Sequence, residues 1–110
     1  MPKKPRLFQK LEAGLQRALS GFHPDLLFYL AGADPYYQDQ LGGLSLTLEG
    51  LRERDSLVMQ AALDHATPVA ICLAGEYAFR VENTVSIHVN TVKVAKETLE
   101  RVGWYRHEAL

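Results

Sequence analysis

Apolar residues in the first part of the chain recur with the spacing of an amphipathic helix. They fall every three or four positions between residues 7 and 22, at Phe8, Leu11, Leu15, Ala18, Leu19 and Phe22. This spacing gathers them into one stripe, which is buried when a helix packs against a core. Gly21 and Pro24 predict where the helix ends, because both residue types terminate helices.

The next segment is continuously apolar and predicts a strand. Residues 26–31 form a short run rich in aromatic side chains, bounded by Pro24 and Gly32. Runs of this kind are typical of strands that are buried on both faces of a sheet. We therefore predict an interior strand over residues 25–31, followed by a loop that begins with Asp34.

A second helix is predicted from Thr47, its expected N-cap, to about residue 66. Its apolar stripe is interrupted by Asp55, which falls on the apolar side. The neighbouring Arg54 is expected to pair with Asp55 or with a group elsewhere. The other members of the stripe are Leu48, Leu51, Val58 and Ala62.

The second half of the chain repeats the strand and helix patterns. Residues 69–73 predict a second interior strand, and residues 83–101 predict a helix. One face of this last helix carries Val85, His88, Val89, Val92, Ala95 and Leu99. The order α-β-α-β-α favours an α/β fold with parallel strands. Parallel strands bring Asp34 and Tyr77, which follow the two strands, to one edge of the sheet.

Composition narrows the class of protein. The 110 residues predict a single domain. The net charge of -1 does not indicate binding to nucleic acid or to an anionic membrane. With one cysteine, Cys72, neither a disulfide framework nor a cysteine-based zinc site is expected. The pattern contains no secretion signal and no apolar run of membrane-spanning length, so a cytoplasmic protein is expected.

Several motifs along this frame resemble those of a known family. They are Ala31-Gly32-Ala33-Asp34 at the end of the first strand, Leu41-Gly42-Gly43-Leu44 in the loop, Leu46-Thr47 with Gly50, Pro68-Val69, Gly75-Glu76-Tyr77 and residues 81–91. Together they resemble the last third of a histone deacetylase-like protein of the zinc-dependent arginase/deacetylase superfamily. The resemblance covers nearly the whole chain and implies a fragment of the three-layer arginase/deacetylase fold.

The resemblance implies a zinc site of which this chain carries one part. Asp34 occupies the position of one of three protein ligands of the catalytic zinc. The other two ligands belong to an Asp-x-Asp-x-His-type segment, and a histidine pair acts as the general base; this sequence has neither. The chain alone is therefore expected to be inactive, and zinc is expected only when the missing ligands are supplied.

The resemblance also implies roles for residues around the acyl group. Tyr77 matches the tyrosine that donates a hydrogen bond to the developing oxyanion. Leu41 matches an apolar residue of the acyl tunnel, and Gly42 and Gly75 match backbone positions beside the substrate. Glu76 stands where the family has glycine, and a carboxylate there can disturb the metal charge or substrate entry.

The histidines that are present do not replace the missing ones. His23 and His65 precede their strands and fall at the opposite edge of the sheet. His88 lies near the start of the last helix, either as a hydrogen-bonded core histidine or as a ligand. Nothing in the sequence places His107.

Two hypotheses of different classes remain open. The chain is either the C-terminal part of a zinc-dependent deacetylase, which acts with a complementing N-terminal half or by self-association, or a non-catalytic remnant that serves as an assembly module. Taken singly, Asp34-Pro35 also reads as a turn, Gly42-Gly43 as a flexible loop and Tyr77 as an amphipathic strand-end residue. A nucleotide-binding unit is disfavoured because neither strand is followed by a glycine-rich phosphate loop.

Overall fold

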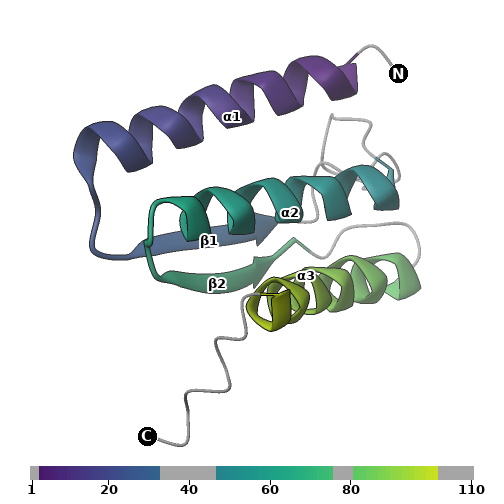
Figure 1. Cartoon of the computed structure of the whole chain (residues 1–110). Helices are drawn as coiled ribbons and strands as arrows, with labels where there is room; N and C mark the ends of the chain where they lie inside the picture. Colours follow the sequence, from purple (N-terminus) through teal and green to yellow (C-terminus); the bar gives the residue numbers. More distant parts are fainter. Residues whose placement is uncertain (1–2, 33–46, 76–80, 102–110) are drawn as a thin grey trace, which may run out of the picture.

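The chain folds into three helices and a parallel two-stranded sheet, shown in Figure 1. The structure is a computed structural model that describes residues 3–32, 47–75 and 81–101. The elements in order are α1 (Lys3–Phe22), β1 (Leu27–Gly32), α2 (Leu48–Asp64), β2 (Val69–Ala74) and α3 (Val81–Arg101). The predicted α-β-α-β-α order and the α/β class are confirmed, with boundaries that shift by a few residues.

The two strands pair in parallel along their whole length. The register runs from Leu27 opposite Val69 to Gly32 opposite Ala74. Because the strands end level with each other, the two loops that follow them leave the sheet from adjacent points on one edge.

Helix α2 lies over one face of the sheet and contacts α1, α3 and β1 (Figure 1). The centre of the core is formed by Leu51 of α2 and Ile87 of α3, each only 1% exposed, with Leu7 and Leu48 packed against them. The predicted stripe of α2 is confirmed, since Leu51, Val58 and Ala62 are buried. Asp55 lies on that buried side as predicted.

Local interactions fix both ends of α2. The Thr47 side chain accepts a hydrogen bond of 3.0 Å from the Gly50 amide, as expected of an N-cap. At the other end, Ala66 adopts a left-handed backbone with φ of 53°. The amides of Ala66 and Thr67 donate to the carbonyls of Leu63 and Ala62, which is the Schellman pattern that ends helices.

The prediction that both strands are buried on two faces is wrong for the described part of the chain. Side chains of Phe28 and Leu30 point away from α2 and are 67% and 69% exposed. Their paired neighbours Ala70 and Cys72 share this face, and Cys72 is exposed. We call these four residues the open face. Its strands have the composition of interior strands, but only one helical layer covers them here.

The apolar face expected of the last helix is not the one that packs. Val85, Val89, Val92 and Leu99 are 41–56% exposed. The residues of α3 that are buried are Thr84, Ile87, Thr91, Val94 and Thr98. Three of them are threonines, and the hydroxyls of Thr91 and Thr98 bond inside the molecule. A face with few large apolar residues therefore packs against α2.

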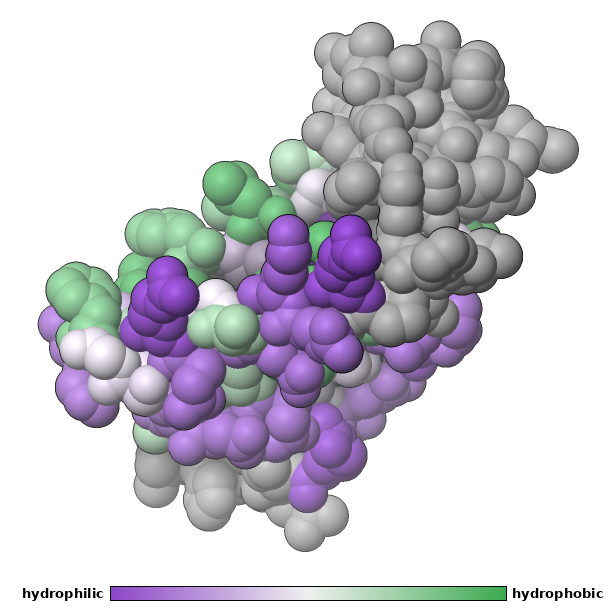
Figure 2. Space-filling view, turned by 90° about the horizontal axis from the view of Figure 1, so that it is seen from above, coloured by the Kyte–Doolittle hydropathy of each residue, from purple (hydrophilic) through white to green (hydrophobic). Residues whose placement is uncertain are grey.

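Several large apolar side chains of the strands and of α3 are therefore exposed at the surface. In Figure 2 hydrophobic residues gather along the upper left of the view, and hydrophilic residues cover its middle and lower part. Contiguous apolar patches of this kind mark surfaces that other protein segments cover.

None of the helices in the described ranges is long and apolar enough to span a membrane.

Candidate functional site

The described residues reach the edge of the sheet where the predicted site lies, but most of the predicted site residues fall outside them. Asp34, Leu41, Gly42 and Tyr77 lie outside the described residues, whereas Gly75 is described. The strand ends that lead to Asp34 and Tyr77 are adjacent, because Gly32 pairs with Ala74. The structure thus brings together the starts of the two segments.

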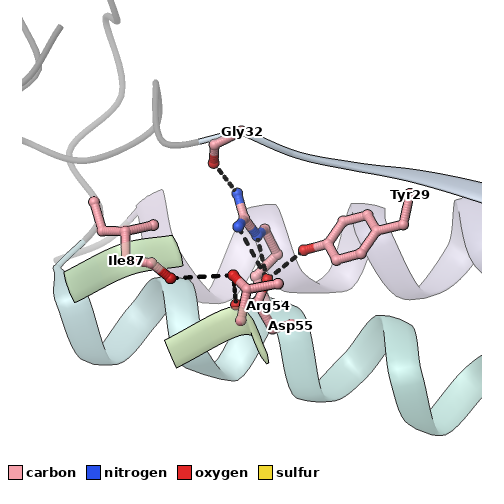
Figure 3. A network of polar contacts seen from close by, with 6 residues as sticks. Tyr29, Gly32, Arg54, Asp55 and Ile87 are labelled. Atoms are coloured by element: carbon pink, nitrogen blue, oxygen red, sulfur yellow. Dashed lines mark hydrogen bonds and ion pairs between the residues drawn. The ribbon is translucent and has the colours of Figure 1, made fainter. Parts of the chain in front are cut away.

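A polar network lies directly beneath the end of β1 (Figure 3). Arg54 of α2 donates a hydrogen bond through Nη1 to the carbonyl oxygen of Gly32. Its Nε and Nη2 atoms donate to Asp55 Oδ1 at 3.2 Å and 2.9 Å. The sequence left open whether Arg54 pairs with Asp55 or with another group, and it does both.

Asp55 is the centre of this network and is fully buried. The Tyr29 hydroxyl of β1 donates to Oδ1, and the Thr91 hydroxyl of α3 donates to Oδ2 at 2.6 Å. The Arg54 guanidinium also lies 5.6 Å from the centre of the Tyr29 ring, within the range of cation–π attraction. The carboxylate therefore joins β1, α2 and α3, and its buried charge is paired and hydrogen-bonded.

A second contact holds the end of β2. Gly75 has a φ of 84°, a backbone conformation that favours glycine. Its carbonyl oxygen lies 3.3 Å from His88 Nε2, and since a carbonyl only accepts, this nitrogen is the donor. His88 is thus a half-buried, hydrogen-bonded histidine. This agrees with the first of the two interpretations of the sequence, a hydrogen-bonded core histidine rather than a ligand.

The described residues do not form a metal site on their own. No group of three or more histidine, cysteine, aspartate or glutamate side chains that could hold a metal ion occurs within residues 3–32, 47–75 and 81–101. His23 follows α1 and His65 caps the end of α2, so both precede the strands as predicted. The donor set of a zinc site is incomplete in this part of the chain.

Burial raises the pKa of the Tyr29 hydroxyl above its ordinary value. Burial is the largest cause; the charge of Arg54 opposes it, and the hydrogen bond to Asp55 adds to the rise. The folded chain therefore keeps the phenol proton at a pH where the unfolded chain loses it. Tyr29 contributes stability in full below about pH 10, and that contribution is lost as the pH rises above this value.

The variant Tyr29→Phe tests this network. We expect the wild-type chain to be the more stable at about pH 8, and its advantage over Tyr29→Phe to shrink by about 1 kcal/mol at about pH 11. Urea denaturation of both proteins at the two pH values measures the difference. A difference that does not change with pH would show that the phenol proton is not held by the fold.

Sequence reasoning did not identify two members of the network, Tyr29 and Thr91. A signal existed for each. Tyr29 is two residues from Ala31, so the period of two in a strand places it on the covered face. Thr84, Thr91 and Thr98 recur every seven residues and so share one side of α3.

The sequence of this chain is similar to those of known proteins. The family model described as histone deacetylase domain matches residues 3–92. An uncharacterized protein from Picosynechococcus sp. is 37% identical over 89 residues, which are 81% of this chain and 30% of that protein. Histone deacetylase 2 of Arabidopsis thaliana is 33% identical over 69 residues, which are 63% of this chain and 18% of that protein.

Proposed function

The chain belongs to the histone deacetylase domain family, and on this premise we propose that it supplies one part of the active site of a zinc-dependent deacetylase that hydrolyses an acetyl-amide such as acetyl-lysine. The observation that carries the proposal is the pairing of Gly32 with Ala74. It starts the Asp34 and Tyr77 segments from adjacent points on one sheet edge.

In this proposal two side chains, Asp34 and Tyr77, take part in the reaction. The Asp34 carboxylate would be one ligand of a zinc ion, and the bound ion would polarise an amide carbonyl and activate water. The Tyr77 hydroxyl donates a hydrogen bond to the carbonyl oxygen of the acetyl group as negative charge develops on it. Leu41, Gly42 and Gly75 line the path of the acyl group.

The site needs groups that this sequence does not contain, namely the histidine pair and the Asp-x-Asp-x-His segment. The chain spans 30% and 18% of the length of the two curated relatives. We propose that a complementing deacetylase segment supplies these groups and packs on the open face and on the sheet edges that the described residues leave unpaired. An apolar face with two exposed large side chains, Phe28 and Leu30, supports this arrangement.

The test combines the chain with a deacetylase segment that carries the missing motifs. Asp34→Ala is expected to abolish zinc binding, because it removes one of the protein ligands. Tyr77→Phe is expected to leave zinc binding unchanged and to lower kcat on an acetyl-lysine peptide about 100-fold, since it removes an oxyanion donor. Zinc titration and peptide turnover measure the two effects. If neither variant changes its quantity, the assigned roles are wrong.

The second candidate is a non-catalytic assembly module. The exposed apolar residues of the open face and of α3 support it as well, since they call for a covering partner and do not require catalysis. The zinc titration separates the two candidates. An assembly module forms its complex, or self-associates, without binding zinc.

A further inference from the structure

Near the end of each strand, a helix side chain donates a hydrogen bond to a backbone carbonyl. The Gly32 carbonyl at the end of β1 accepts from Arg54 of α2, and the Gly75 carbonyl after β2 accepts from His88 of α3. Each held carbonyl lies two residues before a predicted functional residue, Asp34 in the first case and Tyr77 in the second. The two contacts therefore have the same sequence distance to a predicted functional residue, although they come from different helices.

Other contacts hold the Arg54 side chain in place, so its hydrogen bond fixes the position of the Gly32 carbonyl. Its guanidinium is paired with the fully buried Asp55 at 2.9 Å and lies over the Tyr29 ring. Asp55 is held in turn by the Thr91 hydroxyl of α3 at 2.6 Å. A planar guanidinium bonded on two sides loses its rotational freedom, and its remaining donor then defines where the carbonyl oxygen lies (Figure 3).

His88 is fixed by the helix that carries it. Its neighbour Ile87 lies in the centre of the core, which sets the rotation of α3 at this point. The imidazole Nδ1 atom is buried and has no hydrogen-bond partner among the described residues, so the contact with Gly75 is the polar contact that orients the ring there. Because Nε2 donates to the carbonyl, it is not available to ligate a metal.

We propose that Arg54 and His88 are positioning residues, which set the start of the Asp34 segment and of the Tyr77 segment respectively. This inference rests on the proposed function for the roles of Asp34 and Tyr77. Neither side chain contacts the reacting atoms in the proposal. Each acts through one backbone carbonyl. Arg54 acts through Gly32, which precedes the proposed zinc ligand Asp34, so it affects zinc affinity. His88 acts through Gly75, which precedes the proposed oxyanion donor Tyr77, so it affects turnover.

The first arm of the test uses the full zinc-free chain. Substitution Arg54→Lys keeps a positive charge beside Asp55 but has no planar fork to reach both Asp55 and Gly32. His88→Leu removes the donor to Gly75, and His88→Gln keeps an N–H at a similar distance. We expect the NMR order parameter of Gly32 to fall from about 0.85 to below about 0.6 in Arg54→Lys. The same fall is expected at Gly75 in His88→Leu but not in His88→Gln.

The second arm uses the chain combined with the complementing deacetylase segment. Arg54→Lys is expected to weaken zinc affinity about 10-fold or more, in the range seen when groups that orient a metal ligand are removed. His88→Leu is expected to leave zinc affinity unchanged and to lower kcat about 10-fold with little change in KM. His88→Gln should restore most of kcat.

Val58→Ala is the matched control, because Val58 is a buried residue of α2 outside both contacts. It is expected to lower stability without moving zinc affinity, kcat or either order parameter. If Arg54→Lys and His88→Leu behave like Val58→Ala, their role is structural only and the proposal is overturned. If the order parameters fall as expected but Asp34→Ala binds zinc normally, the positioning of the carbonyls stands and the proposed function fails.

Discussion

Asp55→Ala is expected to lower the free energy of unfolding by about 3–5 kcal/mol. The carboxylate is fully buried and accepts hydrogen bonds from Arg54, Tyr29 and Thr91. Its removal leaves a buried guanidinium without its counter-charge and the Tyr29 hydroxyl without its acceptor, whereas the Thr91 hydroxyl keeps the Ile87 carbonyl as an acceptor. Since the whole stability of a domain is about 5–15 kcal/mol, this one change removes a large share of it. Urea denaturation of the full chain measures the loss.

Two further variants give this experiment its controls. Asp64→Ala removes an exposed carboxylate of the same helix, which bonds only to Gln60 in the described contacts, and is expected to change stability by less than about 0.5 kcal/mol. The double variant Arg54→Met with Asp55→Leu removes both charges and is expected to recover most of the loss. A stability of Asp55→Ala within about 1 kcal/mol of wild type would contradict the network.

Leu30→Glu is expected to weaken association with the complementing deacetylase segment about 100-fold or more. The Leu30 side chain is 69% exposed on the open face, so it loses few contacts inside the chain. When a partner covers that face, however, a glutamate carboxylate must be buried without a counter-charge. The stability of the chain alone is expected to change by less than about 1 kcal/mol, since strand propensity is the main term affected.

Isothermal titration of the two components measures the association, and analytical ultracentrifugation of the chain alone measures self-association. Gln9→Glu adds the same charge at an exposed position of α1 and is the matched control. It should bind the segment as the wild-type chain does. Wild-type affinity of Leu30→Glu would mean that the open face is not the docking surface. Loss of self-association alone would identify a second copy as the occupant.

Local patterns determined the elements of this fold. The period of apolar residues predicted all three helices, and the bounded apolar runs predicted both strands. The Thr47 cap was predictable because a cap bonds to the amide three residues ahead in the same chain. The position of Asp55 on the buried side of α2 followed from helical spacing alone. The family resemblance was also carried by sequence, because its motifs have fixed spacing along the β-α-β frame.

The tertiary structure decided which faces are covered and which groups meet. The large apolar residues of α3 favoured one face, but the threonine face packs. There the Thr91 hydroxyl reaches Asp55 and the Thr98 hydroxyl reaches the helix backbone. The Tyr29–Asp55–Thr91 contacts join residues 26 and 36 positions apart in the chain, beyond the range of any local pattern. The apolar composition of β1 indicated that both of its faces are suited to burial. Whether each is covered depends on which layers are present, and that is a property of the assembled structure.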